Sequence, residues 1–191
     1  MDPWFITGIF DAESSFIVTI LKNPRYKTGL NIQARIQIKM HETDRDLILK
    51  VQEYFGGIGY ISNPNQNSTV EFRVSTMKDL TNVIIPHFTN YPLFTKKCFD
   101  YMFFKEIVKL MLEKEHGNLQ GIQKIVNNKA FMNWGLSNEL KKAFPYAIAI
   151  KKEQIVNNYH ILVSVKEWMA GFSTEESNFL LLFKNLKLKV V

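Results

Sequence analysis

Two short segments that lie far apart in the chain are similar, and each carries a glutamate at the same place. Residues 4–16 read WFITGIFDAESSF, and residues 168–179 read WMAGFSTEESNF. Their alignment pairs Gly8 with Gly171 and Glu13 with Glu176, and it pairs Trp4 with Trp168 if one residue is gapped. A recurrence of this kind indicates two copies of one structural unit.

The two glutamates could do chemistry together. Each segment is predicted to form a helix that ends at its glutamate and turns into a strand. Gly8 and Gly171 would let the two helix backbones approach closely, which brings Glu13 and Glu176 together. Two carboxylates at helix C-termini repel each other unless a cation binds there, and hard oxygen ligands favour Mg²⁺. This layout suits metal-assisted phosphodiester hydrolysis. The alternative is two packed helices with glutamates in solvent.

Residues 31–40 alternate without a break between polar and apolar side chains, which predicts a β-strand with one buried face. The apolar face holds Ile32, Ala34, Ile36, Ile38 and Met40. Long hydrogen-bonding side chains and cations, which suit the base edges of the major groove, occupy the other face. They are Asn31, Gln33, Arg35, Gln37 and Lys39.

Positive charge is concentrated around this strand. The chain has 191 residues and a net charge of +6, yet residues 17–41 hold five basic residues and no acid. Three of them, Lys22, Arg25 and Lys27, fall in or near a predicted hairpin loop. The pattern favours a nucleic-acid partner over a solvated strand edge.

The remaining elements give an α+β order of helix, two strands, helix, two strands, then helices. Asp2 is predicted to cap the first helix, which ends near Ala12, and Thr43 the second, with Asp46 completing a capping box. Strands are expected at 16–22, 56–62 and 69–75, with Glu71 and Arg73 facing outward. Further helices are expected at 77–88, 96–113, 119–132, 137–143 and 150–157. Helices would cover one sheet face and leave a four-stranded antiparallel saddle for a duplex.

Composition excludes several classes of protein. A single cysteine, Cys98, rules out a disulfide framework within the chain. No run of about 18 apolar residues is present, and no secretory signal follows Met1, so we expect no membrane partner.

The repeated segments resemble the LAGLIDADG motif of homing endonucleases, with ITGIFDAES and MAGFSTEES in its place. The chain between them is similar to single-chain members from fungal mitochondrial introns. The similar stretches are IQIKMHETD, the GGIGYI to VEFRVS hairpin, YPLFTKKCFDYMFFK and GIQKIVNNKAFMNWGLSNELKKAFP.

This resemblance implies αββαββα repeats whose motif helices pair centrally, and a mitochondrial protein that cuts double-stranded DNA. It implies that Glu13 and Glu176 bind Mg²⁺, or another divalent cation such as Mn²⁺ or Ca²⁺. It places Gln37 close to the active site and makes Lys97 the basic residue that helps to activate or position water and phosphate. The nucleic-acid contacts it suggests are Thr19, Lys22, Arg25, Lys27, Asn31, Gln33, Arg35, Lys39, Glu71 and Arg73.

The sequence departs from the family pattern in two ways. Ser14 and Ser177 replace the last glycine of the motif, which predicts strain or a reshaped site. After Glu176 only one strand, Phe179 to about Lys184, is expected before Val191. We therefore expect one repeat over residues 1–160 and the motif helix and first strand of a second over 161–191. A second chain supplying the missing sheet stays open, as does an inactive binder of nucleic acid, such as an RNA-splicing maturase or a subunit of an RNA–protein assembly.

Overall fold

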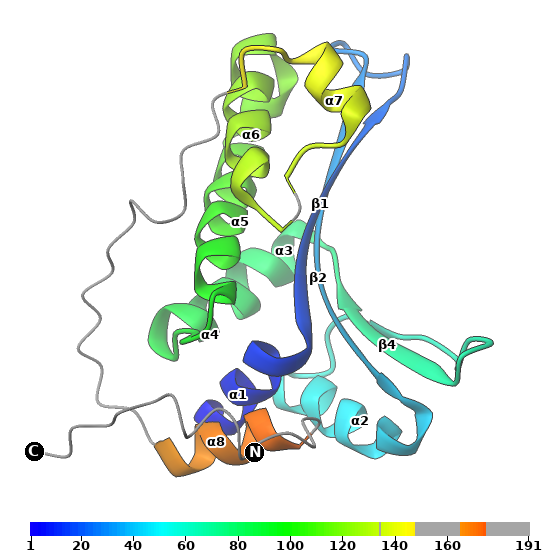
Figure 1. Ribbon diagram of the computed structural model, residues 1–191, viewed down its shortest axis with the longest axis vertical. Coiled ribbons are helices and arrows are strands. Elements are labelled where there is room, and N and C mark those ends of the chain that lie inside the picture. Colours follow the sequence, from blue (N-terminus) through cyan, green and yellow to red (C-terminus); the bar gives the residue numbers. More distant parts are fainter. Residues whose placement is uncertain (134, 148–164, 175–191) are drawn as a thin grey trace, which may run out of the picture.

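The computed structural model describes residues 1–133, 135–147 and 165–174 (Figure 1). The helix expected at 150–157, the strand expected after Phe179, and the residues Glu176 and Ser177 lie outside this described part. No helix within it is long and apolar enough to cross a membrane.

The first helix, α1 (Pro3–Glu13), begins as predicted. The Asp2 carboxylate accepts hydrogen bonds from the backbone N–H groups of Trp4 and Phe5, at 2.8 and 3.3 Å. Such a cap satisfies donors that have no partner inside the helix. Pro3 occupies the first turn, where its missing N–H costs nothing.

The strain expected at Ser14 is absent, so this expectation is wrong. The chain passes from α1 directly into β1 (Ser14–Lys22), and Ser14 has φ −79° and ψ 157°, an ordinary extended conformation. The positive φ that would require a glycine is not found here. The Ser14 hydroxyl donates to the Phe10 carbonyl at 2.5 Å and so helps to end the helix.

Four antiparallel strands form one sheet in the order β1-β2-β4-β3, which confirms the α+β fold class. The long pair is β1 with β2 (Leu30–His41), and β4 (Thr69–Val74) lies on the other side of β2. The register sets Arg35 opposite Ile17 and Glu71 opposite Lys39. Figure 1 shows β1 and β2 as a long curved ribbon from which β4 diverges at one end.

The edge strand β3 (Tyr60–Ile61) is shorter than the predicted strand at 56–62. Gly56, Gly57 and Gly59 have φ values of 75°, 77° and 76°, which no extended strand adopts. These glycines form the entry to the hairpin instead, so the strand starts only at Tyr60.

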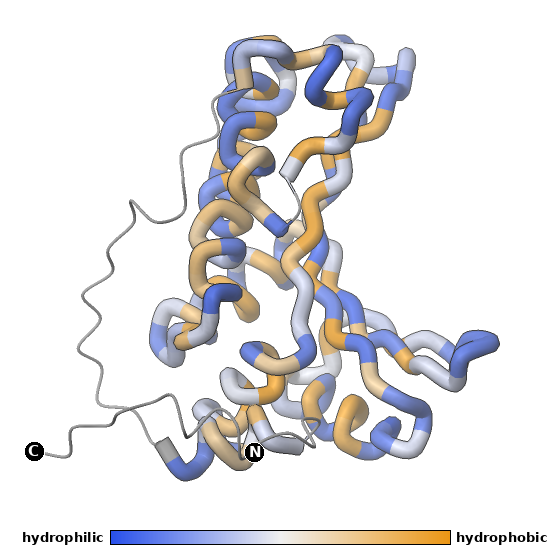
Figure 2. Tube along the Cα trace, in the orientation of Figure 1, coloured by the Kyte–Doolittle hydropathy of each residue, from blue (hydrophilic) through white to orange (hydrophobic). Residues whose placement is uncertain are grey.

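The predicted alternation in β2 is confirmed, because Ile32, Ala34, Ile36, Ile38 and Met40 are all buried. The buried face packs against helices that include α5 (Lys97–Leu112) and α6 (Leu119–Phe131) (Figure 1). Figure 2 shows apolar positions where strands and helices meet and polar positions at the loop between β3 and β4. The opposite face of the sheet is therefore the one available to a partner.

One further helix differs from its predicted bounds. The expected helix 77–88 divides into α3 (Met77–Asp79), a π-type segment (Leu80–Ile84) and α4 (Ile85–Asn90). Pro86 explains the widened turn, because it has no N–H for the regular i→i−4 hydrogen bond. The short helix α7 (Asn138–Ala143) lies where a helix over 137–143 was predicted, and Ser137 caps it.

The prediction for the second helix is wrong at its start. A 3₁₀ turn over Glu42–Asp44 comes first, and α2 (Arg45–Tyr54) follows it. The Thr43 hydroxyl donates to Asp44 at 3.2 Å, and the His41 ring accepts from the Thr43 backbone N–H at 3.4 Å. His41 therefore caps this turn in place of Thr43, and the predicted capping box with Asp46 does not form.

Candidate nucleic-acid interface and active site

The two motif helices lie side by side at one end of the molecule (Figure 1). They are α1 and α8 (Val165–Ser173). A Cβ atom added to Gly8 would overlap the Trp168 carbonyl oxygen, and one added to Gly171 would overlap the Phe5 carbonyl oxygen. The two glycines therefore allow the backbone contact that was predicted from their size. The reciprocal contacts also show that Trp168 corresponds in space to Phe5, without the gap that pairs it with Trp4.

Glu13 is the last residue of α1 and is half-buried. It stands where the helix turns into β1, so its carboxylate lies at the negative end of the helix dipole. Its predicted partner, Glu176, lies outside the described residues. Within the described ranges, no three His, Cys, Asp or Glu side chains form a cluster that could hold a metal ion.

Lys97 is brought to the same corner of the molecule. It is the first residue of α5, it is half-buried, and its ammonium group donates a hydrogen bond to the carbonyl of Ala12. A cation at the C-terminal end of a helix is favoured by the dipole. The structure thus sets Lys97 against Ala12, the residue before Glu13, which lies 85 positions earlier in the chain.

Asp11, which no predicted motif includes as a functional residue, is only 3% exposed. Its carboxylate accepts a hydrogen bond from the Thr95 hydroxyl at 2.7 Å and another from the Trp168 indole N–H at 2.9 Å. Burial raises the pKa of this carboxyl group, and the hydrogen bonds work in the opposite direction. Asp11 lies in an otherwise apolar stretch of α1, and this position in the sequence could have identified it as a candidate residue.

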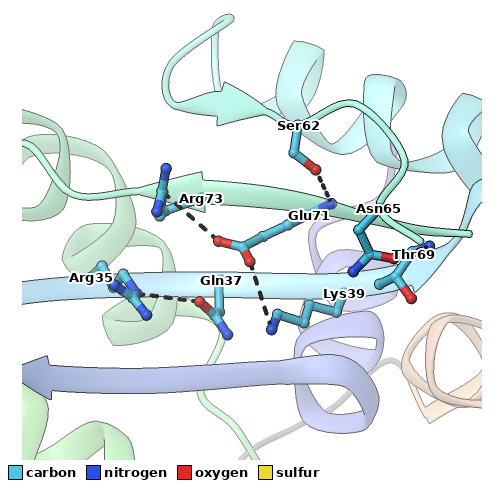
Figure 3. Close-up of polar contacts among 8 residues, drawn as sticks. All are labelled: Arg35, Gln37, Lys39, Ser62, Asn65, Thr69, Glu71 and Arg73. Carbon is cyan, nitrogen blue, oxygen red and sulfur yellow. Dashed lines mark hydrogen bonds and ion pairs between the residues drawn. The ribbon is translucent and has the colours of Figure 1, made fainter. Parts of the chain in front are cut away.

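On the outer face of the sheet, polar side chains contact one another across the strands (Figure 3). Glu71 on β4 lies between two cations: Lys39 Nζ is 3.7 Å and Arg73 Nε is 3.8 Å from its carboxylate oxygens. On β2, Arg35 Nε donates to Gln37 Oε1 at 3.2 Å. The backbone N–H of Glu71 donates to the Ser62 hydroxyl at 2.9 Å.

The exposure of these side chains follows their position along the sheet. Gln33 and Lys39 are exposed, and partial exposure is shared by Thr19, Asn31, Arg35, Glu71 and Arg73. Lys22, Arg25 and Lys27 are exposed at the β1–β2 hairpin, as expected from a loop. Gln37 differs, since it is only 6% exposed although it lies on the outer face. It sits opposite Ser15 of β1, just after the end of α1.

Comparison with known proteins gives consistent matches. The LAGLIDADG endonuclease family matches residues 6–108. A probable intron-encoded endonuclease 2 of Neurospora crassa is 51% identical over 194 residues, which cover 98% of this chain and 43% of that protein. A second Neurospora crassa protein, probable intron-encoded endonuclease 3, is 35% identical over 94% of this chain and 33% of its own length. The chain thus spans less than half the length of these relatives.

Solved structures agree with the sequence matches. The I-SmaMI LAGLIDADG homing endonuclease bound to cleaved DNA is 39% identical with a TM-score of 0.83, over 90% of this chain and 56% of that one. The LAGLIDADG meganuclease I-CpaMI bound to uncleaved DNA is 38% identical with a TM-score of 0.81. The motif similarity, the family match over more than half of the residues and the shared fold lead to one conclusion: the chain belongs to the LAGLIDADG endonuclease family.

Proposed function

We propose that the protein is a homing-type endonuclease that cuts double-stranded DNA at a specific site. The observation that carries this proposal is the position of Glu13 beside the Lys97–Ala12 hydrogen bond, where the closely packed α1 leads into the DNA-facing sheet. Relatives that are named intron-encoded endonucleases, and neighbours whose structures contain DNA, support the same activity.

In this proposal the outer face of the sheet reads the bases. Arg35, Lys39 and Arg73 suit guanine, and the amides of Asn31 and Gln33 suit adenine. Glu71 can accept a hydrogen bond from the N4 amino group of cytosine. The exposed cations of the hairpin, Lys22, Arg25 and Lys27, together with the hydroxyl of Thr19, would contact phosphates, which fix the register of the protein on the duplex.

Glu13 and Glu176 are proposed to hold a divalent cation, Mg²⁺ or alternatively Mn²⁺ or Ca²⁺. The donor set fits, because a carboxylate at the negative end of a helix offers a hard oxygen ligand where positive charge is favoured. The ion would polarise the scissile phosphate and activate a water molecule. A neighbouring structure is of I-SmaMI bound to its uncleaved DNA target in the presence of calcium ions.

Two nearby side chains would complete the site. Lys97 stands where its ammonium group can orient a phosphate oxygen, and it is fixed there by its hydrogen bond to Ala12. Gln37 lies across from Ser15, one residue beyond the start of β1. We propose that its buried amide orients the water or phosphate, while Arg35 fixes the amide rotamer.

We extend the proposal to organisation and location. Residues 1–160 form the first repeat with its trailing helices, and residues 161–191 contribute to a second repeat. The location proposed from the family resemblance is mitochondrial.

The proposal is tested by selecting a target from a pool of random duplexes in Ca²⁺ and then adding Mg²⁺. Cleavage of the selected duplex is expected, and Glu13→Gln should slow it by about 10²-fold or more, because a ligand carboxylate is lost. Glu53→Gln, an exposed position on α2, is the matched control and should cut normally. Equal cleavage by the Glu13→Gln protein would contradict the assigned role.

A further inference from the structure

Among the described residues, four hydrogen-bond donors surround the Asp11 carboxylate. Besides the Thr95 hydroxyl, the backbone N–H groups of Phe94 and Thr95 donate to it at 2.8 and 3.1 Å, and the Trp168 indole N–H completes the set. These donors come from two places far apart in the sequence: the segment that leads into α5, and helix α8. An acceptor-only carboxylate fits such a site, whereas an amide would set a donor against donors.

The same bonds continue to Lys97. The Thr95 hydroxyl oxygen, which donates to Asp11, also accepts from the Lys97 backbone N–H at 3.2 Å. The Lys97 ammonium group then donates to Ala12, the residue after Asp11. A closed circuit of hydrogen bonds therefore runs from the last turn of α1 through Thr95 to the start of α5 and back.

In the part of the chain that the structure describes, this arrangement is present on one side of the helix pair only. The reciprocal glycine contacts relate Phe5 to Trp168 and Gly8 to Gly171, so the residue that corresponds to Asp11 is Thr174. Phenylalanine has no N–H donor that could mirror the indole. The Thr174 hydroxyl donates to the Ala170 carbonyl at 2.7 Å, within its own helix region.

We propose that Asp11 is a positioning residue that couples the docking of α8 to the placement of Lys97. Through its indole N–H, Trp168 holds the carboxylate in the orientation that Thr95 requires, and Thr95 in turn fixes the first turn of α5. The inference deepens the proposed endonuclease function and rests on it for its consequence: loss of the Trp168 bond slows scission of one DNA strand and spares the other.

The test compares Trp168→Phe with Trp4→Phe. Both tryptophan rings contact Phe94, with ring centroids 5.6 and 5.7 Å away, and phenylalanine retains an aromatic ring at either position. Only Trp168 donates its indole N–H to Asp11. The pair of variants therefore separates the hydrogen bond from the aromatic packing.

Amide hydrogen exchange of the full chain is measured by NMR for both variants, after a thermal melt shows that each is folded. We expect Trp168→Phe to speed exchange at Thr95 and Lys97 by about tenfold or more, because one bond of a charge-assisted network is lost. Trp4→Phe should leave both amides near the wild-type rate. Equal exchange in the two variants would overturn the coupling.

A second readout follows each DNA strand separately on the selected duplex. Trp168→Phe should accumulate nicked product, while Trp4→Phe should cut both strands as the wild type does. Equal slowing of both strands would overturn the one-sided assignment. If the wild type cut no duplex, the proposed function would fail, and the exchange rates at Thr95 and Lys97 would still decide whether Asp11 couples the two helices.

Discussion

On the outer face of the sheet, Glu71 forms ion pairs with two cations, and both pairs are weak because they are exposed and widely spaced. The side chains of Lys39, Arg73 and Glu71 are 55%, 40% and 24% exposed, and both separations are close to 4 Å. Pairs of this kind contribute about 0–1 kcal/mol. They can orient the cations in the free protein and be exchanged for base contacts at little cost.

At the scale of single residues, Arg73 allows a specific prediction about base recognition. Its guanidinium lies 5.9 Å from the centroid of the Tyr60 ring, so both Tyr60 and Glu71 restrain it. We expect Arg73→Gln to cost about 1–3 kcal/mol of binding free energy and to relax selectivity at one base pair, as for a lost guanine contact. The measurement is binding to a panel of singly substituted targets.

Lys22→Gln is the matched control for that experiment, because Lys22 is an exposed hairpin cation rather than a residue of the central face. It should weaken binding to every duplex alike and lower the salt slope by about 0.9. A uniform loss for Arg73→Gln as well would contradict its assignment to a base.

At the scale of elements, the packing of α1 on α8 depends on two missing side chains. Alanine at a helical glycine position would normally stabilise by up to about 1 kcal/mol. At Gly8 the added methyl group would overlap the Trp168 carbonyl, and overpacking costs about 1–3 kcal/mol. We therefore expect Gly8→Ala to lower the Tm.

Gly117→Ala provides the comparison, since a Cβ atom there would meet nothing within 4 Å. Its Tm should stay close to that of the wild type. If Gly8→Ala melted at the same temperature as Gly117→Ala, the close approach of α1 and α8 would not hold in solution.

His87 joins three helices through neutral hydrogen bonds. Its ring meets the Thr7 hydroxyl of α1 at 3.3 Å and the Tyr54 hydroxyl of α2 at 3.2 Å, while its own backbone belongs to α4. Burial lowers the pKa of His87 from 6.5 to about 3. At pH values between about 3 and 6.5, the unfolded chain therefore binds a proton at His87 that the folded chain does not bind.

The free energy of unfolding consequently falls as the pH drops below 6.5, by up to about 1.4 kcal/mol per pH unit from this group. When the pH is lowered from about 7 to about 4.5, the free energy of unfolding of the wild type should fall by about 2–3 kcal/mol more than that of His87→Gln. Urea unfolding at both pH values measures the difference. Equal losses in the two proteins would show that His87 is not buried in its neutral form.

Local patterns predicted those elements whose cause lies within a few residues. The alternation in β2 gave the buried face, and Asp2 with Pro3 gave the start of α1. The predictions failed where a single residue changed the backbone, as Pro86 did in the helix after Met77 and Gly59 did before β3. Both residues are visible in the sequence, but the size of their effect depends on the surrounding packing.

At the scale of the whole molecule, the site is assembled from distant parts of the chain. Asp11 bonds with Thr95 and with Trp168, which lie 84 and 157 positions away. The periodicity of a sequence does not predict such long-range contacts. The repeated segment therefore identified Glu13 as a candidate site residue but did not identify Asp11. The cluster of positive charge could be predicted, in contrast to Asp11, because its residues lie within the single stretch 17–41. The fold places these residues along one face of the sheet and one hairpin.

Sequence-specific binding of duplex DNA by this face is the central claim, and one equilibrium measurement tests it most directly. The selected duplex and a scrambled duplex of equal length and composition are titrated with the chain in Ca²⁺ at about 0.15 M salt. We predict that the selected duplex binds at least about 10³-fold more tightly, as specific complexes do. Equal affinity for the two duplexes, or tighter binding to a structured RNA of similar length, would contradict the claim.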